Sequence, residues 1–195
     1  MRIHFNLLAI VCVVLVLASC GSNDNDNNDS NDDENIWVDD ISGLMWQNPL
    51  SDDWMTLEGG MTWEESKAYC ADLVLDDYDG WRLPTISELR SLIRGCETGI
   101  SDVDDEFGAC GVTDECLNSE CRDAPCDGCE TLLDDNYSGE GYWPNELTGD
   151  VDWYWSSSLV ADSGGHDAWA VDFFSALIGI DRYVNFPQSA RCVRR

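Results

Sequence analysis

The stretch "GWRLPTISELRSLIRG", residues 80–95, decides the fold that we expect for this chain. Thr85 and Glu88 stand three residues apart, the spacing of a capping box, so a helix should begin directly after Thr85. Gly95 is the expected C-cap of that helix. The apolar residues between them recur at helical spacing and should face a core: Ile86, Leu89, Leu92 and Ile93.

Two upstream segments add a second helix and a hairpin. "TWEESKAYCADL", residues 62–73, opens with another capping box, formed by Thr62 and Glu65. Its expected buried face consists of Trp63, Ser66, Cys70 and Leu73. "IWVDDISGLMWQ", residues 36–47, predicts two short strands around a turn at residues 39–43.

The C-terminal third predicts strands. They are rich in aromatic and β-branched residues and are separated by turn residues: "DWYWSSSLV" (152–160), "AWAVDFF" (168–174), "LIGIDRYV" (177–184) and "ARCVR" (190–194). Between helices and strands, residues 96–147 are rich in Cys, Asp and Gly and predict a disulfide-stapled loop insertion. All nine tryptophans lie after residue 36, so residues 36–195 should form a single α+β domain with two helices packed on antiparallel sheets.

The N-terminal segment predicts export. Residues 1–19 combine Arg2, an apolar run and small residues near the end, as in a secretory signal peptide. "LASC" resembles a bacterial lipobox, which implies that Cys20 is acylated; the alternative is an ordinary signal peptide with an incidental cysteine. Gly21 in place of Asp implies the outer membrane by the same resemblance. Residues 20–35 then predict a disordered acidic tether between the lipid and the domain.

The formal net charge of −29 restricts the partners. Nucleic acid, anionic lipid surfaces and sulfated glycans should all be repelled. The run Asp76, Asp77, Asp79 and Gly80 only half resembles a calcium loop, because Leu75 stands where the first ligand belongs. We interpret it as a turn, and calcium binding stays an open question.

Eight cysteines lie within residues 36–195: Cys70, Cys96, Cys110, Cys116, Cys121, Cys126, Cys129 and Cys192. An even number in an exported chain predicts four disulfides, and the spacing leaves their pairing open. A zinc site at Cys121, Cys126 and Cys129 is the alternative, since the last two have ligand spacing. We expect disulfides and no metal or other cofactor.

Six blocks, in this order, resemble the C-terminal domain of the Legionella collagen-like adhesin family: "GLMWQ", "TWEESKAYC", "GWRLPTISELRSLI", "YWSSS", "WAVDF" and "ARCVR". The resemblance covers residues 36–195, apart from the Cys-rich insertion. It implies a C-type-lectin-like fold, related to that of sulfatase-modifying factors, in which Cys70 on the first helix bonds Cys192 on the last strand. It also implies a role in adhesion or recognition.

The formylglycine-generating enzymes resemble this chain at "TWEESKAYC" and "RLPTISEL", which are scaffold blocks in which Arg82 and Glu88 have structural roles. Their chemistry needs a C-x4-C copper site before the last strand, whereas residues 174–190 contain no cysteine. The C-x4-C pairs Cys116/Cys121 and Cys121/Cys126 lie in the insertion. A Ser/His/Asp arrangement of residues 156–158, His166 and Asp167 or Asp172 lacks a nucleophile elbow. We therefore expect no enzymatic activity.

Exposed aromatic rings beside carboxylates suit sugar binding. The candidates flank the insertion: Trp143, Trp153, Tyr154 and Trp155. The alternative for each is core packing. Together these features predict an outer-membrane lipoprotein that presents a recognition domain for a glycan or protein ligand. The alternatives are an envelope-structural lipoprotein and a copper-dependent oxidase.

Overall fold

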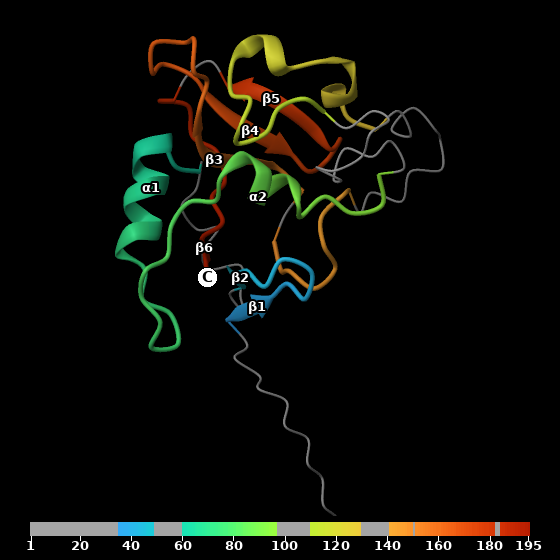
Figure 1. Cartoon of the computed structure of the whole chain (residues 1–195). Helices are drawn as coiled ribbons and strands as arrows, with labels where there is room; N and C mark the ends of the chain where they lie inside the picture. The colour runs from blue at the N-terminus through green and yellow to red at the C-terminus, as the bar shows by residue number, and fades with distance from the viewer. Residues whose placement is uncertain (1–34, 49–59, 97–109, 130–140, 150, 182–183) are drawn as a thin grey trace, which may run out of the picture. The chain divides into compact units, whose positions relative to one another are not determined.

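The first and last segments of the domain meet in one antiparallel sheet. Its strands, in spatial order, are β1 (Ile36–Val38), β2 (Met45–Gln47) and β6 (Val193–Arg194) (Figure 1). Asp39 closes the β1–β2 turn, because its carboxylate accepts the Ser42 hydroxyl at 2.5 Å and its carbonyl accepts the Gly43 N–H at 2.7 Å. Gly43 has φ +68°, which favours glycine at this corner. The predicted hairpin is confirmed.

The computed structural model describes residues 35–48, 60–96, 110–129, 141–149, 151–181 and 184–195. The predicted signal peptide, the predicted acylation site Cys20 and all but the last residue of the predicted tether lie outside these ranges, as does much of the insertion. No helix among the described residues is long and apolar enough to cross a membrane.

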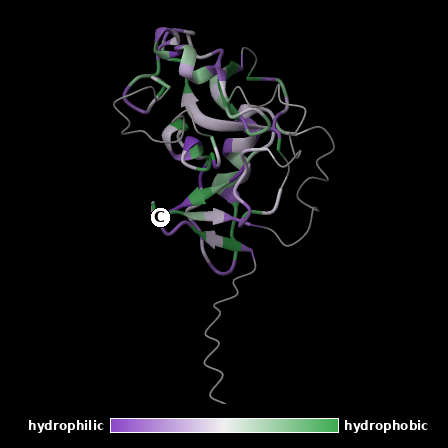
Figure 2. Cartoon of the chain, turned by 90° about the vertical axis from the view of Figure 1, so that its right-hand side faces the viewer, coloured by the Kyte–Doolittle hydropathy of each residue, from purple (hydrophilic) through white to green (hydrophobic). Residues whose placement is uncertain are grey.

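A second antiparallel sheet forms a meander. Its strands are β3 (Trp153–Leu159), β4 (Ala168–Asp172) and β5 (Leu177–Asp181). The pairing places Tyr154, Val171 and Ile178 in one row, and all three belong to the larger core cluster. In the next row Trp155 and Ala170 belong to the smaller cluster, so the sheet buries both faces. Figure 2 shows hydrophobic segments, in green, in several of the strands.

Both predicted capping boxes are present. Helix α1 (Trp63–Asp72) begins after Thr62, and helix α2 (Ile86–Arg90) begins after Thr85. The indole of Trp63 donates to the Ser156 carbonyl at 2.7 Å and thereby ties α1 to β3. The α2 positions predicted to face the core are all buried: Ile86, Leu89, Leu92 and Ile93.

Helix α2 is shorter than predicted, and Gly95 is not its C-cap. The helix ends at Arg90 and Ser91 is the cap. The N–H groups of Leu92 and Ile93 bond to the carbonyls three residues back, and that of Arg94 bonds to Tyr142 at 2.9 Å. A contact with Tyr142, near the end of the insertion, therefore replaces a further helical turn.

The α1 helix is linked covalently to the end of the chain. Cys70 on α1 and Cys192 beside β6 form a disulfide with Cα atoms 5.3 Å apart, and neither residue is exposed. This is the pair that the family resemblance implies. The run before "GWRLP" forms a tight turn, as interpreted from the sequence: Leu75 and Tyr78 pair across Asp76 and Asp77, which have φ of 49° and 64°.

Candidate functional site

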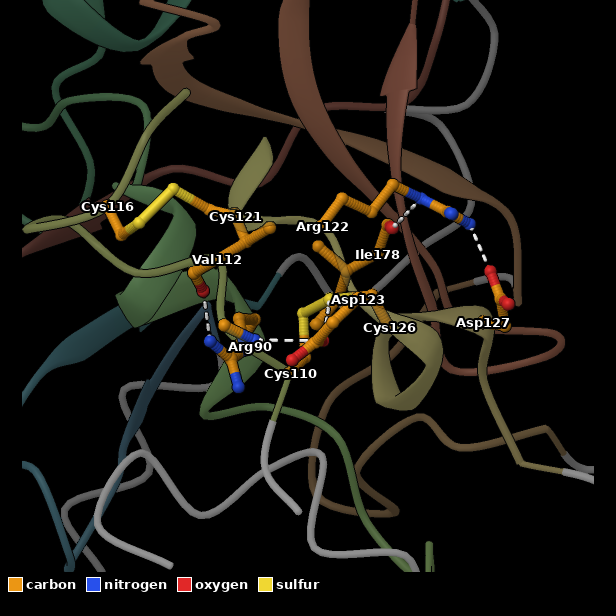
Figure 3. The surroundings of a disulfide bond; sticks show 11 residues. Arg90, Cys110, Val112, Cys116, Cys121, Arg122, Asp123, Cys126, Asp127 and Ile178 are labelled. Carbon is orange, nitrogen blue, oxygen red and sulfur yellow. Dashed lines mark hydrogen bonds and ion pairs between the residues drawn. A yellow bond between two sulfur atoms is a disulfide. The ribbon is translucent and has the colours of Figure 1, made fainter. Parts of the chain in front are cut away.

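The described part of the insertion is held by three disulfides. They join Cys96 to Cys129, Cys110 to Cys126 and Cys116 to Cys121, and Figure 3 shows the last two. Two 3-10 helices lie between these links, η2 (Ser119–Cys121) and η3 (Ala124–Asp127). The zinc alternative is not compatible with this pairing, because Cys121, Cys126 and Cys129 belong to three different disulfides and offer no thiolate.

The insertion is fixed against the β4–β5 turn and strand β5 by two hydrogen bonds to backbone carbonyls. The N–H of Cys129 donates to the Ser175 carbonyl at 3.0 Å, and the Arg122 side chain donates to the Ile178 carbonyl at 3.3 Å. Gly128 between them has φ +95°, and a Cβ there would collide with the Ser175 carbonyl oxygen. Only glycine permits this close approach.

Arg90 lies buried beneath the insertion. Its guanidinium donates to the Val112 carbonyl, beside the Cys110–Cys126 disulfide (Figure 3). Burial lowers the pKa of Arg90 to about 10, against the opposing effect of the carboxylates of Asp123 and Asp114. The group therefore stays charged at neutral pH, and it links α2 to the insertion. Sequence reasoning did not identify Arg90, although it continues the apolar face one residue after Leu89.

Asp123 stands at the start of η3. Its Oδ1 lies 3.2 Å from the Cys126 Sγ and accepts the Gly111 N–H at 3.2 Å. Among the described residues, Cys110, Asp123 and Cys126 form the group whose ligand atoms lie close enough to hold a metal ion. The disulfide between the two cysteines uses both sulfur atoms, so the role that Asp123 has here is to bind the Gly111 backbone.

A small hollow lies between the Cys116–Cys121 loop and the β3–β4 connection. Its volume is about 190 Å³, and six residues line it: Ser119, Val160, Asp162, Ser163, Asp167 and Ile180. The loop is docked at this place because the Leu117 carbonyl accepts the Ala161 N–H at 2.9 Å and the Trp169 indole at 3.1 Å. The insertion therefore supplies one wall of a preformed concave surface.

Hydrogen bonds fix the polar groups of this hollow. Asp162 accepts both the N–H of Ser119, at 2.8 Å, and its hydroxyl, at 2.5 Å. These bonds hold the pKa of Asp162 below its ordinary value, so the carboxylate is charged at neutral pH. Ser163 donates its hydroxyl to the Val160 carbonyl at 2.9 Å and accepts the Asp167 N–H at 3.2 Å. No sequence motif predicted this site, since Ser119 and Asp162 are 43 positions apart.

Three of the four aromatic residues expected to contact a ligand are buried, which corrects the prediction. Tyr154 and Trp155 have no exposed surface, and Trp143 is 7% exposed. Trp143 stacks on Tyr154 with ring centroids 4.7 Å apart, and the buried Arg191 lies 5.1 Å from its ring. Tyr154 and Trp155 are core residues because both faces of the β3–β4–β5 sheet are covered, and Trp143 is one because it packs on Tyr154. Trp153 is partly exposed.

Two of the three "SSS" residues, Ser156 and Ser158, have structural roles. The Ser156 hydroxyl donates to the Trp169 carbonyl at 2.6 Å, and the Ser158 hydroxyl accepts the Ile86 N–H at 3.0 Å. Both serines are buried, whereas His166 is exposed. Ser158 thereby caps α2, a local role that the sequence pattern did not show.

Arg82 and Glu88 form the entrance to α2. The two side chains make two bonds of 2.6 Å, and Glu88 also accepts the Thr85 N–H at 2.9 Å. Burial opposes ionisation of Glu88, but the hydrogen bonds from Arg82 and Thr85 outweigh it and keep the pKa of Glu88 below its usual value. Both residues are scaffold, as expected from the sequence.

Comparison with known proteins gives one match. The family model described as the Lcl C-terminal domain matches residues 35–194, which include all but one of the described residues. No curated protein and no solved structure matches the chain.

Proposed function

Because the chain belongs to the Lcl C-terminal domain family, we propose that it is a non-enzymatic recognition or adhesion protein of the cell envelope. The observation that carries this proposal is the insertion, which three disulfides and its contacts with Ser175 and Ile178 hold against the sheet. A rigid, concave loop surface on a packed scaffold is a common way to build a binding site.

The pairing of the cysteines favours binding over copper-dependent oxidation. An oxidase of the formylglycine-generating type would need two free thiols near a substrate groove. Cys116 and Cys121, one of the two C-x4-C pairs, form a disulfide with each other. Cys126, the partner in the other pair, is bonded to Cys110.

We further propose that the domain has a C-type-lectin-like fold. Two features support it: two capped helices accompany two antiparallel sheets, and a disulfide ties the first helix to the last strand. The hollow beside the insertion is lined mainly by residues of the connection between β3 and β4.

The proposed location is the outer membrane, with acylated Cys20 as the anchor. Two or more acyl chains hold a protein stably to a bilayer. The fifteen residues 21–35 could extend at most about 50 Å, which is enough to lift the domain clear of the lipid headgroups. The net charge of −29 makes sulfated glycans poor ligands and favours neutral or basic ones.

Adhesion of whole cells tests this function. Cells that produce the full chain should adhere to immobilised host or neighbouring-cell surfaces more than cells that lack it. Soluble, disulfide-bonded protein should compete with this adhesion. Equal adhesion with and without the chain, on every surface tried, would leave the envelope-structural alternative as the better account.

A further inference from the structure

The hollow beside the Cys116–Cys121 loop has a definite chemical preference. Its described lining includes two carboxylates, Asp162 and Asp167, and no basic side chain. Both serine hydroxyls use their protons internally, that of Ser119 on Asp162 and that of Ser163 on the Val160 carbonyl. The lining side chains therefore offer acceptors and negative charge to a ligand, which must bring the hydrogen-bond donors.

The size of the hollow limits the ligand to a single side chain or similar group. Its volume is about 190 Å³, whereas pockets for drug-sized ligands measure roughly 300–1,000 Å³. The partly exposed Ile180 supplies apolar surface against which a methylene chain can lie, and the buried Val160 forms the floor beneath it. An aliphatic chain that ends in a cation fits both the lining and the size.

Among cationic groups, the contacts favour an ammonium over a guanidinium. Both oxygens of Asp162 already accept a hydrogen bond from Ser119. A guanidinium fork needs both oxygens of one carboxylate in a planar arrangement, whereas an ammonium can use a remaining lone pair on each of two carboxylates.

We propose that this hollow binds the protonated side chain of a lysine presented by a protein partner. The inference rests on the proposed recognition function and names the partner's chemistry. The net charge of −29 supports it, because the field of the chain draws basic surfaces toward it. Hydrogen bonds hold the Cys116–Cys121 loop in place before a ligand binds, so binding costs little conformational entropy in the protein.

Nuclear magnetic resonance titration of the ¹⁵N-labelled, oxidised protein tests the proposal. The probe is the peptide acetyl-Gly-Lys-Gly-amide, with its Nε-acetyl-lysine counterpart and methyl glucoside as separate arms. The lysine peptide should shift the amide signals of Ser119, Asp162 and Asp167. Asp167→Asn, which keeps the side-chain shape, should weaken the binding about tenfold or more. Asp40→Asn, an exposed change of equal charge in the β1–β2 turn, should weaken it less than about twofold.

The outcomes are distinguishable. Equal weakening of binding by Asp167→Asn and Asp40→Asn would overturn the proposal, because it indicates general attraction to an acidic surface. Signal shifts from the acetylated peptide as large as those from the lysine peptide would also overturn it, because that binding needs no cation. Shifts from methyl glucoside alone would also overturn it, in favour of a sugar site. Absence of pocket shifts with cell adhesion intact would reject the lysine site and leave the recognition function standing. If Asp167→Asn fails to fold, Asp167→Ser provides the comparison, because it also removes the charge and leaves the Ser119–Asp162 bonds that hold the loop intact.

Discussion

Removal of the Cys70–Cys192 disulfide should destabilise the domain more than removal of any other link. The bridge closes a loop of 122 residues, whereas Cys116–Cys121 closes one of 5. In the chain-entropy model the longer loop contributes about 5 kcal/mol to the free energy of unfolding, and the shorter about 2 kcal/mol. The Cys96–Cys129 bridge shortens the long loop. Because the loop entropy depends on the logarithm of loop length, this lowers the contribution of the Cys70–Cys192 bridge by only about 0.3 kcal/mol.

Urea unfolding of three proteins provides the test: the wild type, Cys70→Ala/Cys192→Ala and Cys116→Ala/Cys121→Ala. Circular dichroism and tryptophan fluorescence report the transition, and non-reducing peptide mapping verifies the remaining bridges. We expect the first double variant to lose about 5 kcal/mol or to be unfolded at 37 °C. Equal losses in the two variants would refute the entropic reasoning. Recovery of Cys70 bonded to a cysteine of the insertion would refute the pairing itself.

Three further outcomes follow from the structure. Gly128→Ala should lower the free energy of unfolding, measured in urea, by about 3 kcal/mol or more, because both the φ of +95° and the Ser175 carbonyl oppose a Cβ there. Gly95→Ala is the control: its φ is +74° but the space around it is open, so it should cost only about 1 kcal/mol. Glu88→Gln should destabilise the protein at pH values above the ordinary glutamate pKa of about 4.3. Thermal unfolding should show that the difference in stability from wild type shrinks as the pH falls through the lowered folded-state pKa. A difference that grows on acidification would contradict the lowered pKa. Cys20→Ala should abolish incorporation of labelled fatty acid in a lipoprotein-processing host, and label that persists would exclude Cys20 as the acylation site.

Local sequence signals predicted the elements well, because the physics behind them is local. Thr62 with Glu65 and Thr85 with Glu88 cap both helices as expected, since a capping box needs only four consecutive residues. The strands follow from aromatic and β-branched residues between turns. The early end of α2 could not be predicted, because it depends on the bond from Arg94 to Tyr142, 48 residues away.

The candidate site was harder to predict, because burial and pairing are long-range. Trp143 and Trp155 were candidates for ligand contact with core packing as the alternative, and both lie in the core: Trp155 on a sheet buried on both faces, Trp143 stacked on Tyr154. Ser119 and Asp162 come together only because the insertion docks beside the β3–β4 connection. Arg90 and Arg191 are buried, and only Arg90 has a sequence signal for it, because Arg90 lies on the apolar face of α2.

A thiol titration with copper analysis, on purified oxidised protein, tests most directly the claim that this domain binds rather than catalyses. All eight described cysteines are in disulfides, so the account predicts no reactive thiol, no tightly bound stoichiometric copper and no oxidation of cysteine-containing peptides. Two reactive thiols together with one bound copper ion per chain would contradict the account and establish the oxidase as the better hypothesis.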